Sequence, residues 1–240
     1  MLTAAFWAAV GSSALVVGAV IGFFEDLPMR VVGLVMGFGA GTLLSAVSFD
    51  LVLESYREAD GWAIFVGLLL GALVFWAGDW ALEKFTPGGE DPVVGETVSG
   101  TSLVFGAALD GIPESVAIGL TILAGGSVSV AMVVAVFLSN VPEGMAAAVG
   151  LRRAGHSRAR ILWLFVGVVA MCVVAAAVGY TLLGGASPDV IALIQAFAAG
   201  AILALLAITL MPEAYAHGGR EVGLVTALGF IFASALATAG

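Results

Sequence analysis

Charged residues are scarce in this sequence: Asp, Glu, Lys and Arg make up 10% of its 240 residues, whereas hydrophobic residues make up 61%. A typical soluble domain carries about 25% charged residues. The shortage of charge therefore excludes an ordinary soluble protein and predicts an integral membrane protein in contact with lipid. The net charge of −9, with no basic segment interleaved with aromatics, argues against nucleic-acid binding.

Cysteine and histidine are also rare, with one Cys and two His in the chain. Cys172 lies in an apolar run, and a single cysteine can form neither an intrachain disulfide nor a thiolate metal cluster. His-rich zinc motifs and the Gly-x-Ser-x-Gly sequence are absent, which argues against a hydrolase. We therefore expect neither enzymatic activity nor an organic cofactor.

Long apolar runs are abundant in the sequence. Runs of about 18 or more apolar residues can cross a bilayer as helices, so we predict an all-α polytopic membrane protein in which 1–240 form one transmembrane domain. The eight predicted helices, called spans 1 to 8, cover 4–24, 31–53, 62–82, 102–123, 129–149, 161–183, 190–211 and 222–238. The first run lacks a basic n-region and is too long for a signal-peptide core, so we expect it to be a span.

Basic residues are distributed unevenly between the connections. The connections after spans 1, 3, 5 and 7 hold Arg30, Lys84, Arg152, Arg153, Arg158, Arg160 and Arg220, whereas those after spans 2, 4 and 6 hold only Arg57. The positive-inside rule therefore predicts a multi-pass protein of the cell membrane with both termini extracytoplasmic. The one long connection, 83–100, is polar and acidic and is predicted to be a flexible cytoplasmic loop.

Spans 2 and 7 are similar to each other in sequence. The segment "FGAGTLLSAVSFDLVLESY" from Phe38 aligns without a gap to "FAAGAILALLAITLMPEAY" from Phe197, which pairs Glu54 with Glu213. Spans 4 and 5 share a Pro-Glu step, in "IPESVA" and "VPEGMA". Because the members of each pair cross in opposite directions, we predict an inverted repeat of the kind found in secondary transporters. Chance similarity between helices rich in small residues is the alternative.

Spans 4 and 5 carry polar side chains near the middle of their apolar sequence. Asp110 and Glu114 share one face of span 4, and Ser139, Asn140 and Glu143 share one face of span 5. The short turn between the two spans makes them antiparallel, so we expect the two polar faces to meet at a similar depth. Each charge there costs about 2.5 to 3.5 kcal/mol on insertion scales, a cost that a bound cation would relieve.

Prolines accompany both polar faces. Pro113 and Pro142 cannot donate the usual helical hydrogen bond, so each leaves a backbone carbonyl that can line a cavity with ions or water. The five polar residues above are therefore our predicted metal site. The alternative explanation is a pair of kinked helices whose carboxyl groups are protonated and bonded to neighbouring helices.

At this point the sequence resembles the ZIP (Zrt/Irt-like protein) family of divalent metal transporters, in particular its short prokaryotic members. The resemblance rests on eight spans, both termini outside, a long connection after span 3, and the Pro-Glu motifs of spans 4 and 5. It implies transport of zinc, iron(II) or manganese into the cytoplasm, with the metal ion as substrate, and a site formed by spans 4 and 5.

The sequence departs from the family pattern at the predicted site. Asp110 stands where the family motif has His, Gly111 stands where it has Asn, and span 6 lacks the acidic metal ligand that is often found there. These changes leave an all-oxygen site, and oxygen donors favour manganese, magnesium or calcium without excluding zinc. Two alternatives remain: a proton-coupled carrier of a small solute, and a ZIP-like protein that has lost metal transport.

Polar residues near the span ends form a second group. Asp50, Glu54, Glu213 and His217 are expected at the entrance or exit of the pathway, with simple solvation at the membrane surface as the alternative. Two stripes of small residues are spaced for close helix packing, either within the chain or in a homodimer. These stripes are Gly33, Gly37 and Gly41, and Gly67 and Gly71.

Overall fold

The computed structural model describes residues 1–24, 28–59, 61–85 and 100–239, and within these ranges every regular element is a helix. The all-α class predicted from the apolar runs is therefore confirmed. In chain order the elements are α1 (Leu2–Ile21), α2 (Met29–Ala46), η1 (Val47–Leu53), α3 (Glu54–Glu58), α4 (Gly61–Phe85), α5 (Gly100–Gly125), α6 (Val130–Arg153), α7 (Arg158–Leu183), α8 (Pro188–Leu205), η2 (Leu206–Leu210), α9 (Met211–Gly218) and α10 (Glu221–Ala239).

Seven helices in the described ranges are long and apolar enough to cross a membrane, and a shorter apolar helix at Glu221–Ala237 matches the eighth predicted span. Seventeen residues of α-helix reach about 26 Å, which is close to the thickness of the hydrocarbon core. The helices α4 and α5 extend into the two ends of the predicted loop 83–100. Residues 86–99, and with them the predicted flexibility, lie outside the described residues.

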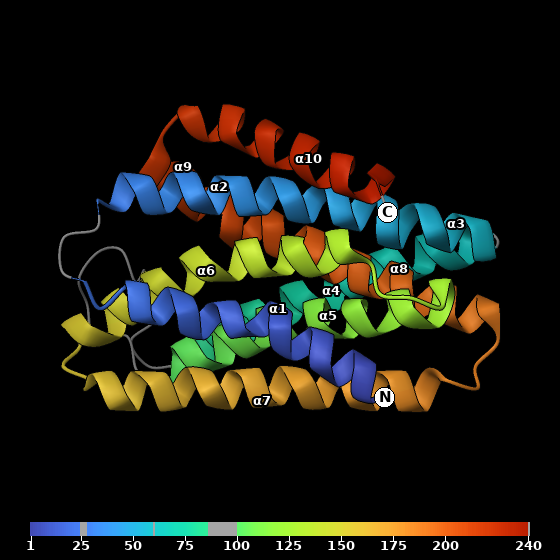
Figure 1. Ribbon diagram of the computed structural model, residues 1–240, viewed down its shortest axis with the longest axis horizontal. Coiled ribbons are helices and arrows are strands. Elements are labelled where there is room, and N and C mark those ends of the chain that lie inside the picture. Colours follow the sequence, from blue (N-terminus) through green and yellow to red (C-terminus); the bar gives the residue numbers. More distant parts are fainter. Residues whose placement is uncertain (25–27, 60, 86–99, 240) are drawn as a thin grey trace.

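The helices run side by side, so each connection lies at one of two ends of the bundle (Figure 1). One end, which we call the basic end, holds all seven basic residues of the odd-numbered connections. At the opposite end, called the acidic end, Arg57 is the basic residue among those described, together with Glu54, Glu58 and Asp189. Both chain termini lie at the acidic end (Figure 1). The structure thus shows the predicted division of basic residues, and which end faces the cytoplasm stays a prediction.

Large apolar side chains cover the outside of the bundle. Trp62, Trp163 and Leu224 are each about three quarters exposed, at 74%, 75% and 73%. Such exposure is unfavourable in water but ordinary against lipid. Trp62 lies at the start of α4 and Trp163 near the start of α7, so the two indole rings lie toward opposite ends of the bundle, where membrane interfaces favour them.

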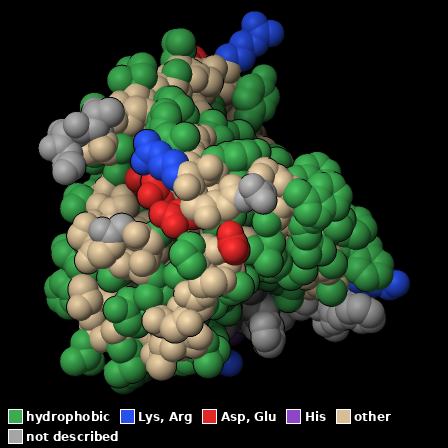
Figure 2. Space-filling model, turned by 90° about the vertical axis from the view of Figure 1, so that its right-hand side faces the viewer, with side chains coloured by type: hydrophobic (Ala, Val, Ile, Leu, Met, Phe, Trp, Pro, Cys, Tyr) green, Lys and Arg blue, Asp and Glu red, His purple; other side chains and the backbone are tan. Residues whose placement is uncertain are grey.

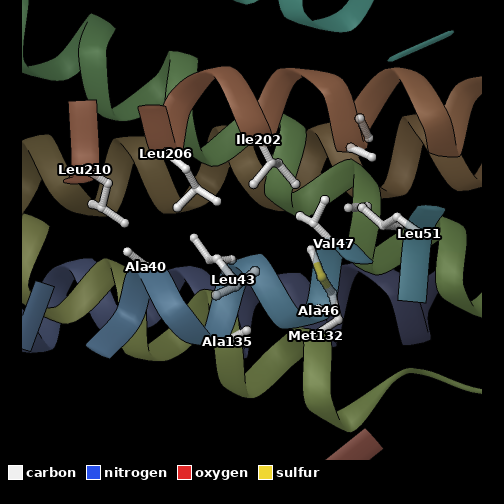
Figure 3. Packing of buried hydrophobic residues seen from close by; sticks show 14 of the residues in the cluster. Ala40, Leu43, Ala46, Val47, Leu51, Met132, Ala135, Ile202, Leu206 and Leu210 are labelled. Atoms are coloured by element: carbon white, nitrogen blue, oxygen red, sulfur yellow. The ribbon is translucent and has the colours of Figure 1, made fainter. Parts of the chain in front are cut away.

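The centre of the bundle is an apolar core around α2 and η1. Leu43 and Val47 from this span, Met132 from α6, and Ile202 and Leu206 from α8 and η2 are all buried. Figure 3 shows their side chains meeting between the two spans of the predicted repeat. This core fixes α6, the helix that carries Asn140 and Glu143, against α2.

Both stripes of small residues are used within the chain. A Cβ on Gly41 would collide with the backbone of Thr226 in α10, and a Cβ on Gly71 would collide with the backbone of Phe197 in α8. Glycine therefore lets these helices approach backbone to backbone, as in other membrane bundles. The stripes supply no argument for a homodimer, which stays untested.

Spans 2 and 7 share an irregularity at matching positions. The π-helical segments η1 and η2 begin at Val47 and Leu206, which the sequence alignment pairs with each other. The two spans run in opposite directions through the bundle (Figure 1). Pro212, just after η2, removes one helical donor and accounts in part for the wider turn there. The inverted repeat itself stays a prediction, and this shared feature supports it.

Candidate metal site

The predicted polar residues of spans 4 and 5 lie on α5 and α6. Each of these helices contains its proline in the interior. Glu114 lies about 17 to 21 Å along α5 from either end, and Asn140 is similarly central in α6, at about 1.5 Å per residue. Both motifs therefore lie at mid-depth of the bundle, as the sequence predicts.

Most of these side chains are buried. The exposed fraction is 8% for Asp110, 2% for Glu114, and 1% each for Ser139 and Asn140, while Glu143 is half-buried. Polar groups are seldom so deeply buried unless they are hydrogen-bonded, paired or bound to an ion. Each of these side chains therefore needs a hydrogen bond, an oppositely charged neighbour or a bound ion.

A hydrogen bond joins the two helices at this depth. The Asn140 amide nitrogen donates to Glu114 Oε2 at 3.4 Å, and the Ser139 hydroxyl donates to the carbonyl of Val136 in its own helix. The predicted approach of the two motifs is therefore present. Asn140 Oδ1 is buried without a hydrogen-bond partner, so one acceptor oxygen at the meeting point remains available.

The three carboxyl groups influence one another. Glu143 interacts electrostatically with Asp110 and Glu114, and Asp110 also interacts with Asp79 and Glu213. Like charges in a poorly solvated interior repel strongly. A divalent cation at this place would change these repulsions into attractions.

The side chains are not gathered tightly around one point. Within the described residues, no group of three or more His, Cys, Asp or Glu side chains lies close enough to hold a metal ion. Amide, hydroxyl and backbone oxygens are outside that count. The arrangement is thus an open set of oxygen donors on two facing helices.

A residue that sequence reasoning set aside lies next to this set. Cys172 of α7 is fully buried, and its Sγ lies 2.8 Å from the position that a Cβ on residue 111 would occupy. The carboxyl groups of Glu114 and Glu143 interact electrostatically with the thiol. The packing of α7 on α5 therefore brings one sulfur atom to the position next to Gly111, while the all-oxygen composition of the site stays a prediction.

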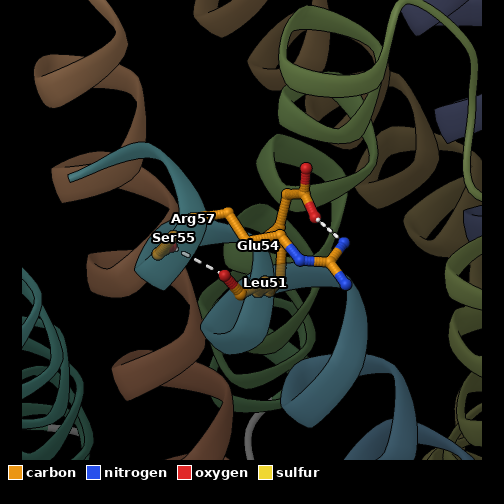
Figure 4. Close-up of polar contacts among 4 residues, drawn as sticks. All are labelled: Leu51, Glu54, Ser55 and Arg57. Atoms are coloured by element: carbon orange, nitrogen blue, oxygen red, sulfur yellow. Dashed lines mark hydrogen bonds and ion pairs between the residues drawn. The ribbon is translucent and has the colours of Figure 1, made fainter.

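The predicted entrance residues lie at the acidic end, away from the α5 and α6 motifs. Ser129, at the start of α6, donates to Asp50 Oδ2 at 2.9 Å. Glu54 accepts from Arg57 at 2.9 Å, and the Ser55 hydroxyl donates to the carbonyl of Leu51 (Figure 4). Figure 2 looks onto this end and shows acidic side chains gathered beside a basic one. Both carboxylates are therefore engaged in local contacts in this structure.

Glu213 and His217 lie one turn apart on α9 and line a common cavity with parts of α2 and α6. The cavity measures about 40 Å³, and its lining includes Met29 and Arg153. His217 Nε2 is buried without a hydrogen-bond partner, and Glu213 interacts electrostatically with Glu143. The cavity therefore lies toward the basic end. Through Glu213 its lining interacts electrostatically with Glu143 of the α6 motif.

Comparisons with known proteins give one informative similarity. No protein-family model matches the sequence. The chain is 28% identical over 217 residues to a protein of Arabidopsis thaliana named "Putative zinc transporter", and this match includes 89% of the chain but only 35% of the relative. The chain thus spans about a third of the length of that relative. The similarity and the apolar helices together describe a multi-pass membrane protein that resembles a protein named as a metal transporter.

Proposed function

We propose that this protein transports divalent metal cations across the cell membrane into the cytoplasm. The observation that carries the proposal is the meeting of two proline-containing helices at mid-depth, where Asn140 and Glu114 are in contact and Glu143 is close by. Intramembrane carboxylates without a cation are costly. The resemblance to the ZIP family and the name of the Arabidopsis relative support the same function.

In this proposal the ion is held by oxygen donors from both helices. Glu114 and Glu143 supply negative charge, while Asp110, Ser139 and Asn140 complete the coordination together with water or backbone carbonyls. Because the donors are not gathered in advance, the side chains close on the ion as it binds. Glu213 and His217 would receive the ion on its way to the cytoplasm, and Asp50 and Glu54 would attract it on the outer side.

The test is uptake of zinc, iron(II) and manganese into proteoliposomes that contain the purified protein. We expect uptake of at least one of these metals, and its loss in Glu114→Gln and in Glu143→Gln, because each variant removes a charge that the ion needs. The matched control is Glu221→Gln. Glu221 forms an exposed ion pair with Arg30 at the basic end, and such pairs contribute little.

Two results would contradict the proposal. Undiminished uptake in both site variants would remove these residues from the pathway. Transport of another solute that continues in the presence of a metal chelator would instead favour the proton-coupled carrier. The first result addresses the site, and the second addresses the substrate.

A further inference from the structure

Helix α7 lies at the edge of the bundle and is packed on one side only (Figure 1). Its packed side faces α1 and α5 and buries side chains such as Phe165 and Cys172. The other side exposes large apolar side chains along most of the helix, namely Trp163, Val166, Met171, Val174, Val178 and Leu182. At the helical repeat these positions form one broad surface, which suits the acyl chains of lipid.

An arginine stands at the start of this exposed surface. Arg160 is exposed and precedes Trp163 by one helical turn, so the two side chains share a face. The first turn of α7 also holds Arg158 and no acidic residue. Basic side chains are disfavoured at a helix N-terminus, because the amide groups there already carry partial positive charge. The start of α7 thus has an excess of positive charge, which an anion would relieve.

The neighbouring sequence supplies no negative charge to Arg160. Residues 144–188 contain four arginines and no Asp or Glu. Arg30, at the same end of the bundle, is paired with Glu221 at 2.7 Å, whereas the guanidinium of Arg160 forms no ion pair with a described residue. The backbone N–H of Arg160 donates to the Ser157 hydroxyl, which leaves the charged side chain for a group from outside the chain.

We propose that the start of α7 binds the headgroup of an anionic phospholipid through Arg160. The lipid phosphate lies beside the guanidinium, the indole of Trp163 lies one turn deeper, at the level that membrane interfaces favour, and an acyl chain lies along Val166 and Val174. The basic end is predicted to face the cytoplasm, and anionic lipids give the cytoplasmic leaflet its negative surface potential. The inference rests on this surface alone and does not depend on metal transport.

Tryptophan fluorescence tests the site at Trp163 itself, because bromine on an acyl chain quenches an indole that the chain touches. The purified protein is reconstituted in mixtures of phosphatidylglycerol and phosphatidylcholine in which one lipid at a time is brominated. Because the chain has five Trp, the signal of Trp163 is the difference between each protein and its Trp163→Phe partner. We expect phosphatidylglycerol to be preferred at Trp163 by about fivefold, the attraction of one arginine near a charged surface.

Three variants show which side chain is responsible. Arg160→Gln should abolish the preference at Trp163, whereas Arg160→Lys should keep most of it because lysine retains the charge. Arg30→Gln is the matched control, since it removes an exposed arginine of the same end that is already paired with Glu221, and it should leave the preference unchanged. Unchanged quenching of the other four tryptophans in Arg160→Gln would show that this variant is folded.

Several results would overturn the inference. Equal quenching of Trp163 by the two lipids, or a preference that survives in Arg160→Gln, would remove the headgroup site. Loss of the preference in Arg30→Gln as well would assign it to the general charge of the basic end. Quenching by neither lipid, in a particle with twice the mass of one chain, would show that a second copy covers α7. A preference that Arg160→Gln abolishes and Arg160→Lys keeps would establish the site.

Discussion

Asn140 illustrates how a single residue can be unfavourable for folding and useful for binding. Its Oδ1 is buried without a partner, and leaving a buried polar atom unpaired costs about 1 to 3 kcal/mol. The same oxygen stands beside Glu114, where a cation is proposed to bind. The unpaired oxygen is therefore expected to lower the stability of the metal-free protein, and this cost can be measured.

We expect Asn140→Leu to weaken metal binding while the metal-free protein keeps or gains stability. The apolar side chain removes the unpaired oxygen and loses only one long hydrogen bond to Glu114. Isothermal titration with zinc would measure the affinity, and thermal unfolding in detergent without metal would measure the stability. A variant that binds metal normally but unfolds at a lower temperature would show that Asn140 is structural.

Gln195 provides the matched control for this comparison. It is another fully buried amide, on α8, and neither polar atom of its side chain has a hydrogen-bond partner. Gln195→Leu should stabilise the protein for the same reason as Asn140→Leu, yet leave metal affinity and uptake unchanged. Loss of uptake in Gln195→Leu would mean that this second amide also belongs to the pathway.

At the scale of the helix, the position of α6 depends on its contact with α1. A Cβ on Gly144 would collide with the backbone of Leu15, and a Cβ on Gly18 would collide with the carbonyl of Val141. The two helices therefore touch backbone to backbone on either side of Pro142. Because Asn140 and Glu143 are on this segment, the glycines determine where the site residues stand.

We expect Gly144→Ala to destabilise the protein by about 1 to 3 kcal/mol, the usual cost of overpacking, and to reduce metal uptake by shifting α6. Gly167→Ala on α7 is the control, because a Cβ there meets open space and alanine favours the helix by about 0.5 to 1 kcal/mol. Thermal unfolding and uptake should be measured for both. Equal unfolding temperatures for the two variants would show that α1 and α6 can separate without penalty.

At the scale of the whole molecule, charge is divided between two ends. The basic end collects seven Arg and Lys residues from four connections, whereas at the opposite end the described residues include one basic side chain, Arg57, beside the carboxylates of Glu54, Glu58 and Asp189. Positively charged connections are retained in the cytoplasm during insertion. The carboxylates of the end that is predicted to face outward would raise the local concentration of cations before they enter a pathway.

This division predicts the outcome of cysteine labelling in intact cells. Gly185→Cys, at the acidic end, should react with a membrane-impermeant maleimide, whereas Ala154→Cys, at the basic end, should react only after the membrane is permeabilised. Both positions are exposed, and the natural Cys172 is buried, so the unmodified protein is the control for background. The opposite pattern would reverse the predicted orientation.

Much of the fold could be predicted from sequence patterns, because a helix that crosses lipid must meet simple requirements. A helix that crosses a membrane must be long and apolar, so the eight spans can be counted directly from the sequence. The approach of the two polar faces was also predicted, because a short turn brings spans 4 and 5 to the same depth, but the particular contact of Glu114 with Asn140 came from the structure. The boundaries near the long connection were less exact, since α4 continues to Phe85 and α5 begins at Gly100.

The sequence by itself determined the helical class, the charge of each end, and the two proline-containing motifs at mid-depth. Only the tertiary structure decided which other helix reaches those motifs. Cys172 lies in an apolar run and carries no pattern of its own, and its place next to Gly111 follows from how α7 packs on α5. Periodicity reports the environment of a residue within its own helix, whereas contacts between distant helices depend on the shapes of all the side chains between them.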